Sequence, residues 1–145
     1  PTGICTPGGA IFGLTRGTKR EHIIRAAQES IAYQVADLVA CMEADTGLKL
    51  RTLKADGGAS RDSFLMQFQA DVTGCVVRRP AIRETTALGA AYLAGLAAGV
   101  WADQEELKRL WVCDTIYQPT ADAEKREALM ASWHKAVERC RGWAK

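Results

Sequence analysis

Residues 54–65 read Lys-Ala-Asp-Gly-Gly-Ala-Ser-Arg-Asp-Ser-Phe-Leu. Before this stretch, the alternation of apolar and polar residues predicts a strand over 48–55. After it, apolar residues recur at helical spacing and predict a helix over about 62–72. The Asp-Gly-Gly sequence is therefore predicted to be a turn that leads from a strand into a helix.

This turn has the composition of a ligand-binding segment. Gly57 and Gly58 carry no Cβ, so their backbone can lie close to a flat or anionic ligand. The helix start that follows would offer unpaired N–H groups and the positive end of a helix dipole. Together these features are typical of part of a nucleotide site. The alternative is an ordinary tight turn in which Asp56 or Ser60 caps the helix.

The rest of the chain alternates between strand and helix patterns. An apolar run bounded by glycines predicts a strand at 9–14, and an apolar stripe predicts a helix over about 21–45. A further strand is predicted at 75–78, and Pro119 is predicted to open a final helix. This order indicates an α/β fold, in which ligands bind at the carboxyl ends of the strands. The Asp-Gly-Gly turn lies at such an end.

Two predicted helices carry expectations about burial. In the first, the stripe expected to face the core consists of Ile24, Ile31, Val35, Leu38 and Met42. The second lies within residues 85–102, which contain no charged side chain. Alanine and glycine supply most of that stretch, which favours a buried helix over a membrane span. Close packing is expected through three small residues, Gly89, Ala90 and Gly95.

Composition restricts the class of protein. The 145 residues are 48% hydrophobic and 25% charged, which is enough for one domain with a core. The net charge of +2 and the lack of long Lys/Arg clusters argue against nucleic-acid binding. Five cysteines without a Cys-x-x-Cys pair argue against a disulfide framework and a zinc site, and fit a reducing cytoplasm. Cys41 and Cys140 are expected to be small core residues. The chain starts at Pro1, so its start need not be a natural domain boundary.

Three ordered blocks of sequence point to a known family. The first covers residues 9–17, 22–26 and 29–34, the second residues 56–59 and 64–71, and the third residue 84 with residues 86–95. These blocks resemble the FGGY carbohydrate kinases, and within that family the glycerol kinases. The resemblance runs from about residue 9 to the end of the chain, and three blocks in order are far more specific than any one of them.

The resemblance implies an α/β fold that is the C-terminal part of an actin-like ATPase (ribonuclease H-like) domain, a mixed sheet with packed helices. Residues 1–145 would form a partial C-terminal kinase domain, with the N-terminal domain and the start of the C-terminal domain absent. The implied activity is transfer of the γ-phosphate of ATP, with Mg²⁺, to glycerol to give glycerol 3-phosphate. The implied partners are ATP, glycerol and the rest of the kinase chain, without nucleic acid or membrane. A homo-oligomer stays open.

The resemblance also assigns site residues. Gly57, Gly58 and Ala59 match the turn against which adenosine lies. Asp62 stands where glycerol kinases usually carry an Asn that contacts the adenine side, and an ionised Asp accepts but cannot donate a hydrogen bond. Gln28 also departs from the family pattern, which favours an apolar residue there. No catalytic or metal-binding residue is expected in this chain, because the catalytic aspartate belongs to segments N-terminal to it.

Two alternatives to a glycerol kinase stay open. The whole protein could be another FGGY kinase that acts on a pentulose or related sugar, since the substrate is bound by segments upstream of this chain. The chain could also be a non-catalytic folded fragment, because it lacks the catalytic residue of the family.

Overall fold

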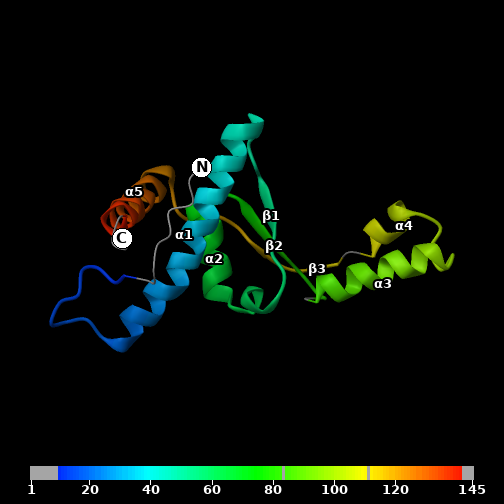
Figure 1. Ribbon diagram of the computed structural model, residues 1–145, viewed down its shortest axis with the longest axis horizontal. Helices are drawn as coiled ribbons and strands as arrows, with labels where there is room; N and C mark the ends of the chain where they lie inside the picture. The colour runs from blue at the N-terminus through cyan, green and yellow to red at the C-terminus, as the bar shows by residue number, and fades with distance from the viewer. Residues whose placement is uncertain (1–9, 83, 111, 142–145) are drawn as a thin grey trace.

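The computed structural model describes residues 10–82, 84–110 and 112–141. The elements follow in the order α1 (Arg20–Thr46), β1 (Thr52–Lys54), η1 (Gly58–Arg61), α2 (Ser63–Thr73), β2 (Val76–Pro80), α3 (Thr85–Ala97), α4 (Gln104–Arg109), β3 (Cys113–Tyr117) and α5 (Ala123–Cys140). Figure 1 shows α1, α2 and α5 gathered beside the strands. In the same view α3 and α4 extend away from them, and we call this pair of helices the arm.

The sheet has three strands in the order β1-β2-β3. β1 runs parallel to β2, and β2 runs antiparallel to β3. A parallel pair needs a crossover connection, and α2 supplies it. Gly74 ends α2 in the left-handed conformation with φ 70°. The strands predicted at 48–55 and 75–78 are confirmed with different bounds, the first shorter and the second extending to Pro80.

The core lies between α2 and the helices and strands around it. α2 buries Leu65, Met66, Phe68, Ala70 and Val72. Val77 of β2 and Tyr117 of β3 close the core on the sheet side. Leu129 and Met130 of α5 pack against it from the opposite end of the chain. α2 is thus the central element, and its first residues lie directly beyond the Asp-Gly-Gly turn.

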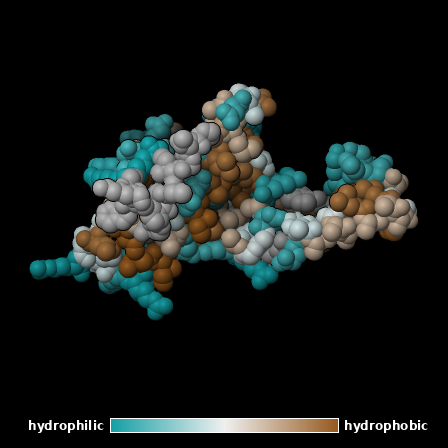
Figure 2. Space-filling model, viewed as in Figure 1, coloured by the Kyte–Doolittle hydropathy of each residue, from teal (hydrophilic) through white to brown (hydrophobic). Residues whose placement is uncertain are grey.

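The face of α1 that packs on α2 differs from the predicted one. Ala32, Ala36 and Val39 are buried, with Val39 7% exposed. Leu38, from the predicted stripe, is 59% exposed, and Ile31 also faces solvent. Small side chains let the two helices approach closely, so the larger apolar side chains remain on the open side of α1. Figure 2 shows brown apolar patches in this region.

Residues 10–14 do not form the predicted strand. Their backbone has no regular structure, and Ile11, Phe12 and Leu14 are exposed. A strand needs a neighbour that pairs with its backbone N–H and C=O groups. Within the described ranges, no strand lies beside this segment. Gly9, which begins the predicted strand, lies outside the described residues.

The arm is more exposed than the sequence predicts. Gly95 is the buried member of the three small residues, whereas Leu93 is 70% exposed. A Cβ added at Gly95 would lie 2.0 Å from the ring of Trp101, so this glycine allows Trp101 to fold back onto α3. The close packing predicted for α3 is therefore confirmed only at Gly95 and is wrong for the other two, because Ala90 is exposed and a Cβ added at Gly89 would meet no atom within 4 Å. Among the described helices, none combines the length and hydropathy needed to cross a bilayer.

The cysteines also differ from expectation. Cys41 is exposed and Cys140 is partly exposed, so neither is a buried core residue. Cys75, at the start of β2, is buried instead, and burial raises the pKa of its thiol. All four described cysteines are free thiols, and Cys5 lies outside the described residues.

Candidate nucleotide-facing turn

The candidate site is the turn between β1 and α2, residues 55–62. It begins where the Ala55 N–H donates to the carbonyl of Arg78 at 3.0 Å, just past the last paired residues of the two parallel strands. The turn therefore lies at the carboxyl-end edge of the parallel pair. This edge is where α/β sheets bind ligands.

Gly57 and Gly58 have different backbone requirements. Gly57 adopts φ 78° and ψ −175°, a conformation that L side chains rarely take. Gly58 opens the short helix η1 without a positive φ. A Cβ added at either glycine would meet no other atom of the described chain within 4 Å. Gly58 and Ala59 are exposed, so this part of the turn presents an open backbone surface to a ligand.

Asp62 caps α2, a role that the sequence interpretation gave to Asp56 or Ser60. One carboxylate oxygen of Asp62 accepts hydrogen bonds from the N–H of Phe64 at 2.9 Å and of Leu65 at 3.1 Å. Asp62 lies in the extended conformation typical of a cap residue, directly before the first residue of α2. The prediction of Asp56 or Ser60 as the cap is wrong because η1 lies between those residues and the start of α2.

The second oxygen of Asp62 accepts a hydrogen bond from the side-chain amide of Gln28 on α1. The two positions that depart from the family pattern are therefore partners in this structure. Both oxygens of Asp62 are engaged within the chain, and the Met66 N–H is also satisfied, by the Asp62 carbonyl. The start of α2 is thus not the set of unpaired donors that the sequence predicts, and a carboxylate already occupies its positive end. This arrangement disfavours an anionic group beside the start of α2.

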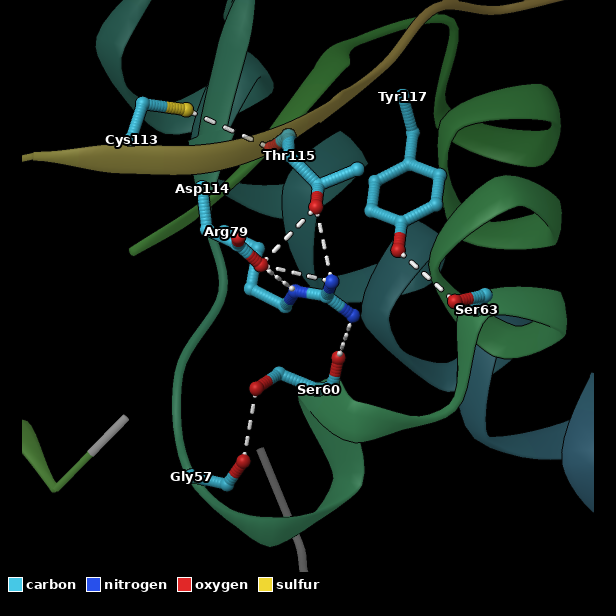
Figure 3. Close-up of polar contacts among 8 residues, drawn as sticks. All are labelled: Gly57, Ser60, Ser63, Arg79, Cys113, Asp114, Thr115 and Tyr117. Carbon is cyan, nitrogen blue, oxygen red and sulfur yellow. Dashed lines mark hydrogen bonds and ion pairs between the residues drawn. The ribbon is translucent and has the colours of Figure 1, made fainter. Parts of the chain in front are cut away.

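The inner side of the turn is fixed by Ser60 and Arg79. Ser60 is 1% exposed, and its hydroxyl donates to the carbonyl of Gly57 at 2.7 Å. Arg79 of β2 donates from Nη1 to the Ser60 carbonyl at 3.2 Å. Figure 3 shows this chain of contacts from Gly57 through Ser60 to the guanidinium of Arg79. A side chain of the sheet thereby contacts the backbone of the turn directly.

β3 supports the same region from the other side. Tyr117 donates its hydroxyl to Ser63 Oγ at 3.1 Å, which connects β3 to the first residue of α2. The guanidinium of Arg79 lies over the Tyr117 ring, 5.8 Å from its centroid. Asp114 pairs with Arg79 at 2.8 Å (Figure 3). The turn and the start of α2 are therefore both tied to the sheet.

Sequence reasoning missed Arg79 and Asp114. One signal was present, because strand alternation with a buried Val77 places residue 79 on the same inward face. The partner on β3 could not be predicted, since Asp114 is distant in sequence and the register comes from the folded sheet.

Positions outside the turn provide less evidence for a ligand site. Thr15 and Arg16 lie in an exposed turn in which the Thr15 N–H donates to Thr18 Oγ1 at 2.9 Å. Glu84 precedes α3 without a side-chain cap bond. Across the described ranges, no group of three or more His, Cys, Asp or Glu side chains is arranged to hold a metal ion.

Comparison with known proteins identifies relatives along nearly the whole chain. Residues 6–98 match the C-terminal domain of the FGGY family of carbohydrate kinases. A glycerol kinase of Clostridium beijerinckii is 61% identical over 93% of this chain and 27% of that protein. Glycerol kinase 2 of Thermotoga maritima is 57% identical over 94% of this chain and 28% of that protein. This chain therefore spans little more than a quarter of the length of these relatives.

Solved structures agree with the sequence relatives. Plasmodium falciparum glycerol kinase with ADP superposes with a TM-score of 0.82 at 36% identity, over 90% of this chain and 26% of that one. A xylulose kinase of Lactobacillus acidophilus shares the fold at 23% identity, with a TM-score of 0.69 over 93% of this chain and 26% of that one. The fold is thus that of the C-terminal part of an actin-like ATPase domain. On the family match and these relatives, the chain belongs to the FGGY family of carbohydrate kinases, in the region of their C-terminal domain.

Proposed function

We propose that this chain is part of an ATP-dependent glycerol kinase, which transfers the γ-phosphate of ATP to glycerol to give glycerol 3-phosphate. The observation that carries the proposal is identity of 57–61% to proteins named glycerol kinase over more than nine-tenths of the chain. The rest of the kinase chain, including the catalytic aspartate, would be supplied by segments outside residues 1–145. Four free thiols fit a cytoplasmic location for such an enzyme.

Within this kinase, we assign the turn to one wall of the adenosine site. Gly57, Gly58 and Ala59 would lie against the nucleoside, because their backbone is open and no Cβ protrudes from the two glycines. Asp62 would act at the edge of this wall, as the cap that sets the direction of α2. The solved glycerol kinase with ADP, at 36% identity, supports a nucleotide as the ligand of this fold.

The proposed reaction requires positioning and charge neutralisation more than covalent chemistry from the protein. Mg²⁺ would neutralise charge on the phosphates of ATP during transfer. The described residues do not form a cation site of three His, Cys, Asp or Glu side chains, so we assign no metal ligand among them. The contribution of this chain would be to hold the nucleoside in place and to move with its domain.

Activity assays test this proposal. The complete protein is expected to release ADP in a coupled assay when glycerol and Mg·ATP are both present. The 145-residue chain alone is expected to show no turnover, because the catalytic aspartate of the family is not in it.

Three outcomes would contradict the proposal. Robust turnover by the 145-residue chain would show that the catalytic groups lie within it. Turnover of xylulose but not of glycerol by the complete protein would identify a different member of the family. A complete protein that turns over no polyol or sugar would support the non-catalytic alternative.

A further inference from the structure

Arg79 is a charged side chain placed where burial would normally be costly. It is 9% exposed, and it lies on β2 between the turn and β3 (Figure 3). A guanidinium removed from water destabilises a fold unless its donors find partners. The identity and location of those partners therefore indicate what the arginine holds together.

The partners of Arg79 lie on two sides. Toward β3, Nε and Nη2 both donate to one carboxylate oxygen of Asp114, at 3.1 Å and 2.8 Å. Nη2 also donates to Thr115 Oγ1 at 2.8 Å, and Thr115 in turn donates to the same Asp114 oxygen at 3.0 Å. These contacts fix the plane of the guanidinium. The remaining nitrogen, Nη1, then points at the Ser60 carbonyl at 3.2 Å.

Residues of the turn also form hydrogen bonds with one another. Both the N–H and the hydroxyl of Ser60 donate to the Gly57 carbonyl, at 3.3 Å and 2.7 Å, and the Asp62 N–H donates to the Ala59 carbonyl at 3.1 Å. Such bonds set the internal shape of the turn without fixing its place relative to the sheet. The Ala55 N–H bond to the Arg78 carbonyl ties the first residue of the turn to the sheet, and the bond from Arg79 ties its middle, through the residue next to Ala59.

We propose that Arg79 is a positioning residue for nucleotide binding. It holds the Gly57–Ala59 backbone in the position relative to the sheet that adenosine binding requires. Arg79 does not touch the nucleotide in this proposal, and it acts through the Ser60 carbonyl. The inference rests on the proposed function, because it takes the turn to be a wall of the nucleotide site. It predicts that loss of the guanidinium weakens nucleotide binding and leaves glycerol binding nearly unchanged.

The test uses the complete protein with Arg79→Met and Arg79→Lys. Methionine fills similar volume without donors. Lysine keeps the charge, but its single ammonium cannot form the planar set of bonds to both Asp114 and Ser60. The expected result is a dissociation constant for ADP that rises about tenfold or more for Arg79→Met and somewhat less for Arg79→Lys. The KM for glycerol is expected to stay within about twofold.

Two control variants separate positioning from loss of stability or charge. Val39 is buried and lines one hollow with Val72 and Thr73, at the end of α2 away from the turn, so Val39→Ala is expected to lower the melting temperature without moving the Ser60 carbonyl. Lys49→Met removes a positive charge from an exposed ion pair with Glu43. Neither is expected to change ADP affinity. If Val39→Ala weakens ADP binding as much as Arg79→Met does, the effect of Arg79 is merely structural and the inference is wrong.

A further variant, Asp114→Asn, keeps the inference testable if Arg79→Met does not fold. Asp114→Asn keeps an acceptor for Arg79 but removes the charge that orients the guanidinium, and it is expected to raise the ADP dissociation constant about threefold. Unchanged ADP affinity in folded Arg79→Lys and Asp114→Asn would overturn the inference.

Direct titration with ADP tests the role of Arg79 independently of whether the protein phosphorylates glycerol. If the wild-type protein binds ADP but does not phosphorylate glycerol, the proposed function fails and the role of Arg79 is still decided by its variants. If the wild-type protein does not bind ADP, both proposals fail.

Discussion

At the scale of single residues, the two glycines of the turn have separable roles. Gly57 is required by its own backbone, since its φ of 78° would strain any residue with a Cβ. Gly58 has no such requirement, and a Cβ there would meet open space in the chain. Nothing in the described protein therefore excludes a side chain at residue 58, whereas adenosine in the proposed position would exclude it.

Gly58→Val is expected to weaken ATP binding with little loss of stability. The Cβ branch would occupy the space assigned to adenosine, while the melting temperature should change only by the equivalent of about 0.5 kcal/mol. Gly57→Ala is the matched comparison, and its strain is expected to cost about 1 kcal/mol or more. Melting curves combined with titrations of ATP and glycerol measure both effects. If folded Gly58→Val binds ATP as the wild type does, the turn is not the adenosine wall.

Asp62 is expected to tolerate Asn and not Ala. An Asn side chain can still cap α2 with its oxygen, and Gln28 can rotate its amide to present an acceptor instead of a donor. Asp62→Asn should therefore change the free energy of unfolding by less than about 0.5 kcal/mol, whereas Asp62→Ala should lower it by about 1 kcal/mol. Urea unfolding of the complete protein distinguishes the two. Equal losses for both variants would argue against the cap.

At the scale of elements, Asp71 connects α2 to the segment that leads into α5. Its Oδ1 accepts hydrogen bonds from the N–H and hydroxyl of Thr120, at 2.6 Å and 3.0 Å, and from the N–H of Ala121 at 3.3 Å. The Gln67 amide donates to the same oxygen at 3.2 Å. Partial burial acts to raise the pKa of Asp71, but these donors outweigh it and hold the pKa below its ordinary value of 3.8.

This lowered pKa gives the stability a defined dependence on pH. The stabilisation from Asp71 is present above the unfolded-state pKa of 3.8 and is lost as the pH falls through the lower pKa of the folded state. Asp71→Asn is expected to lower the free energy of unfolding by about 1–2 kcal/mol at neutral pH, because it weakens several hydrogen bonds. The difference from the wild type should shrink as the pH falls below about 4. Urea unfolding at several pH values measures this. A difference that is constant with pH would contradict the assignment.

Variants on the two faces of α1 test which face is buried in the folded protein. Val39 is buried and Leu38 faces solvent, although the two are adjacent in sequence. Val39→Glu would place a carboxylate at a position that is 7% exposed, and it is expected to disrupt the α1–α2 contact at a cost of several kcal/mol. Leu38→Glu is expected to change stability by about 0.5 kcal/mol or less. Circular dichroism and limited proteolysis of the 145-residue chain compare them. Equal damage from both variants would restore the predicted stripe as the buried face.

At the scale of the whole molecule, the features that depend on neighbouring residues were predictable from sequence. Gly47 and Gly74 end their helices in the left-handed conformation, with φ 68° and 70°, as their places after helical patterns indicate. The alternation of helices and strands and the resemblance of three sequence blocks gave the α/β fold and the family. The position of the turn between β1 and α2 was also predictable, because glycines and helical spacing are local signals.

Features that depend on distant segments were not predictable. α1 carries a stripe of large apolar residues and a stripe of small ones, and only contact with α2 decides that Ala32 and Ala36 are buried. The apolar run at 9–14 has the pattern of a strand, but pairing requires a neighbour that the pattern does not specify. The contact from Arg79 to Ser60 likewise depends on the register between β2 and β3. Assignment of the turn to adenosine remains a prediction.

The pairing of β2 with β3 has a consequence for how the chain could vary in length. Pro80 lies opposite Cys113, and the Ala81 N–H donates to the Val112 carbonyl at 3.0 Å, so the chain segments before and after the arm lie side by side. Topologically, β2 and β3 form a hairpin whose loop has been expanded into two helices. Closing a loop some eight times longer costs only about 2 kcal/mol of extra chain entropy. The arm can therefore be lengthened, shortened or replaced by a short turn while the hairpin that carries Arg79 and Asp114 keeps its geometry.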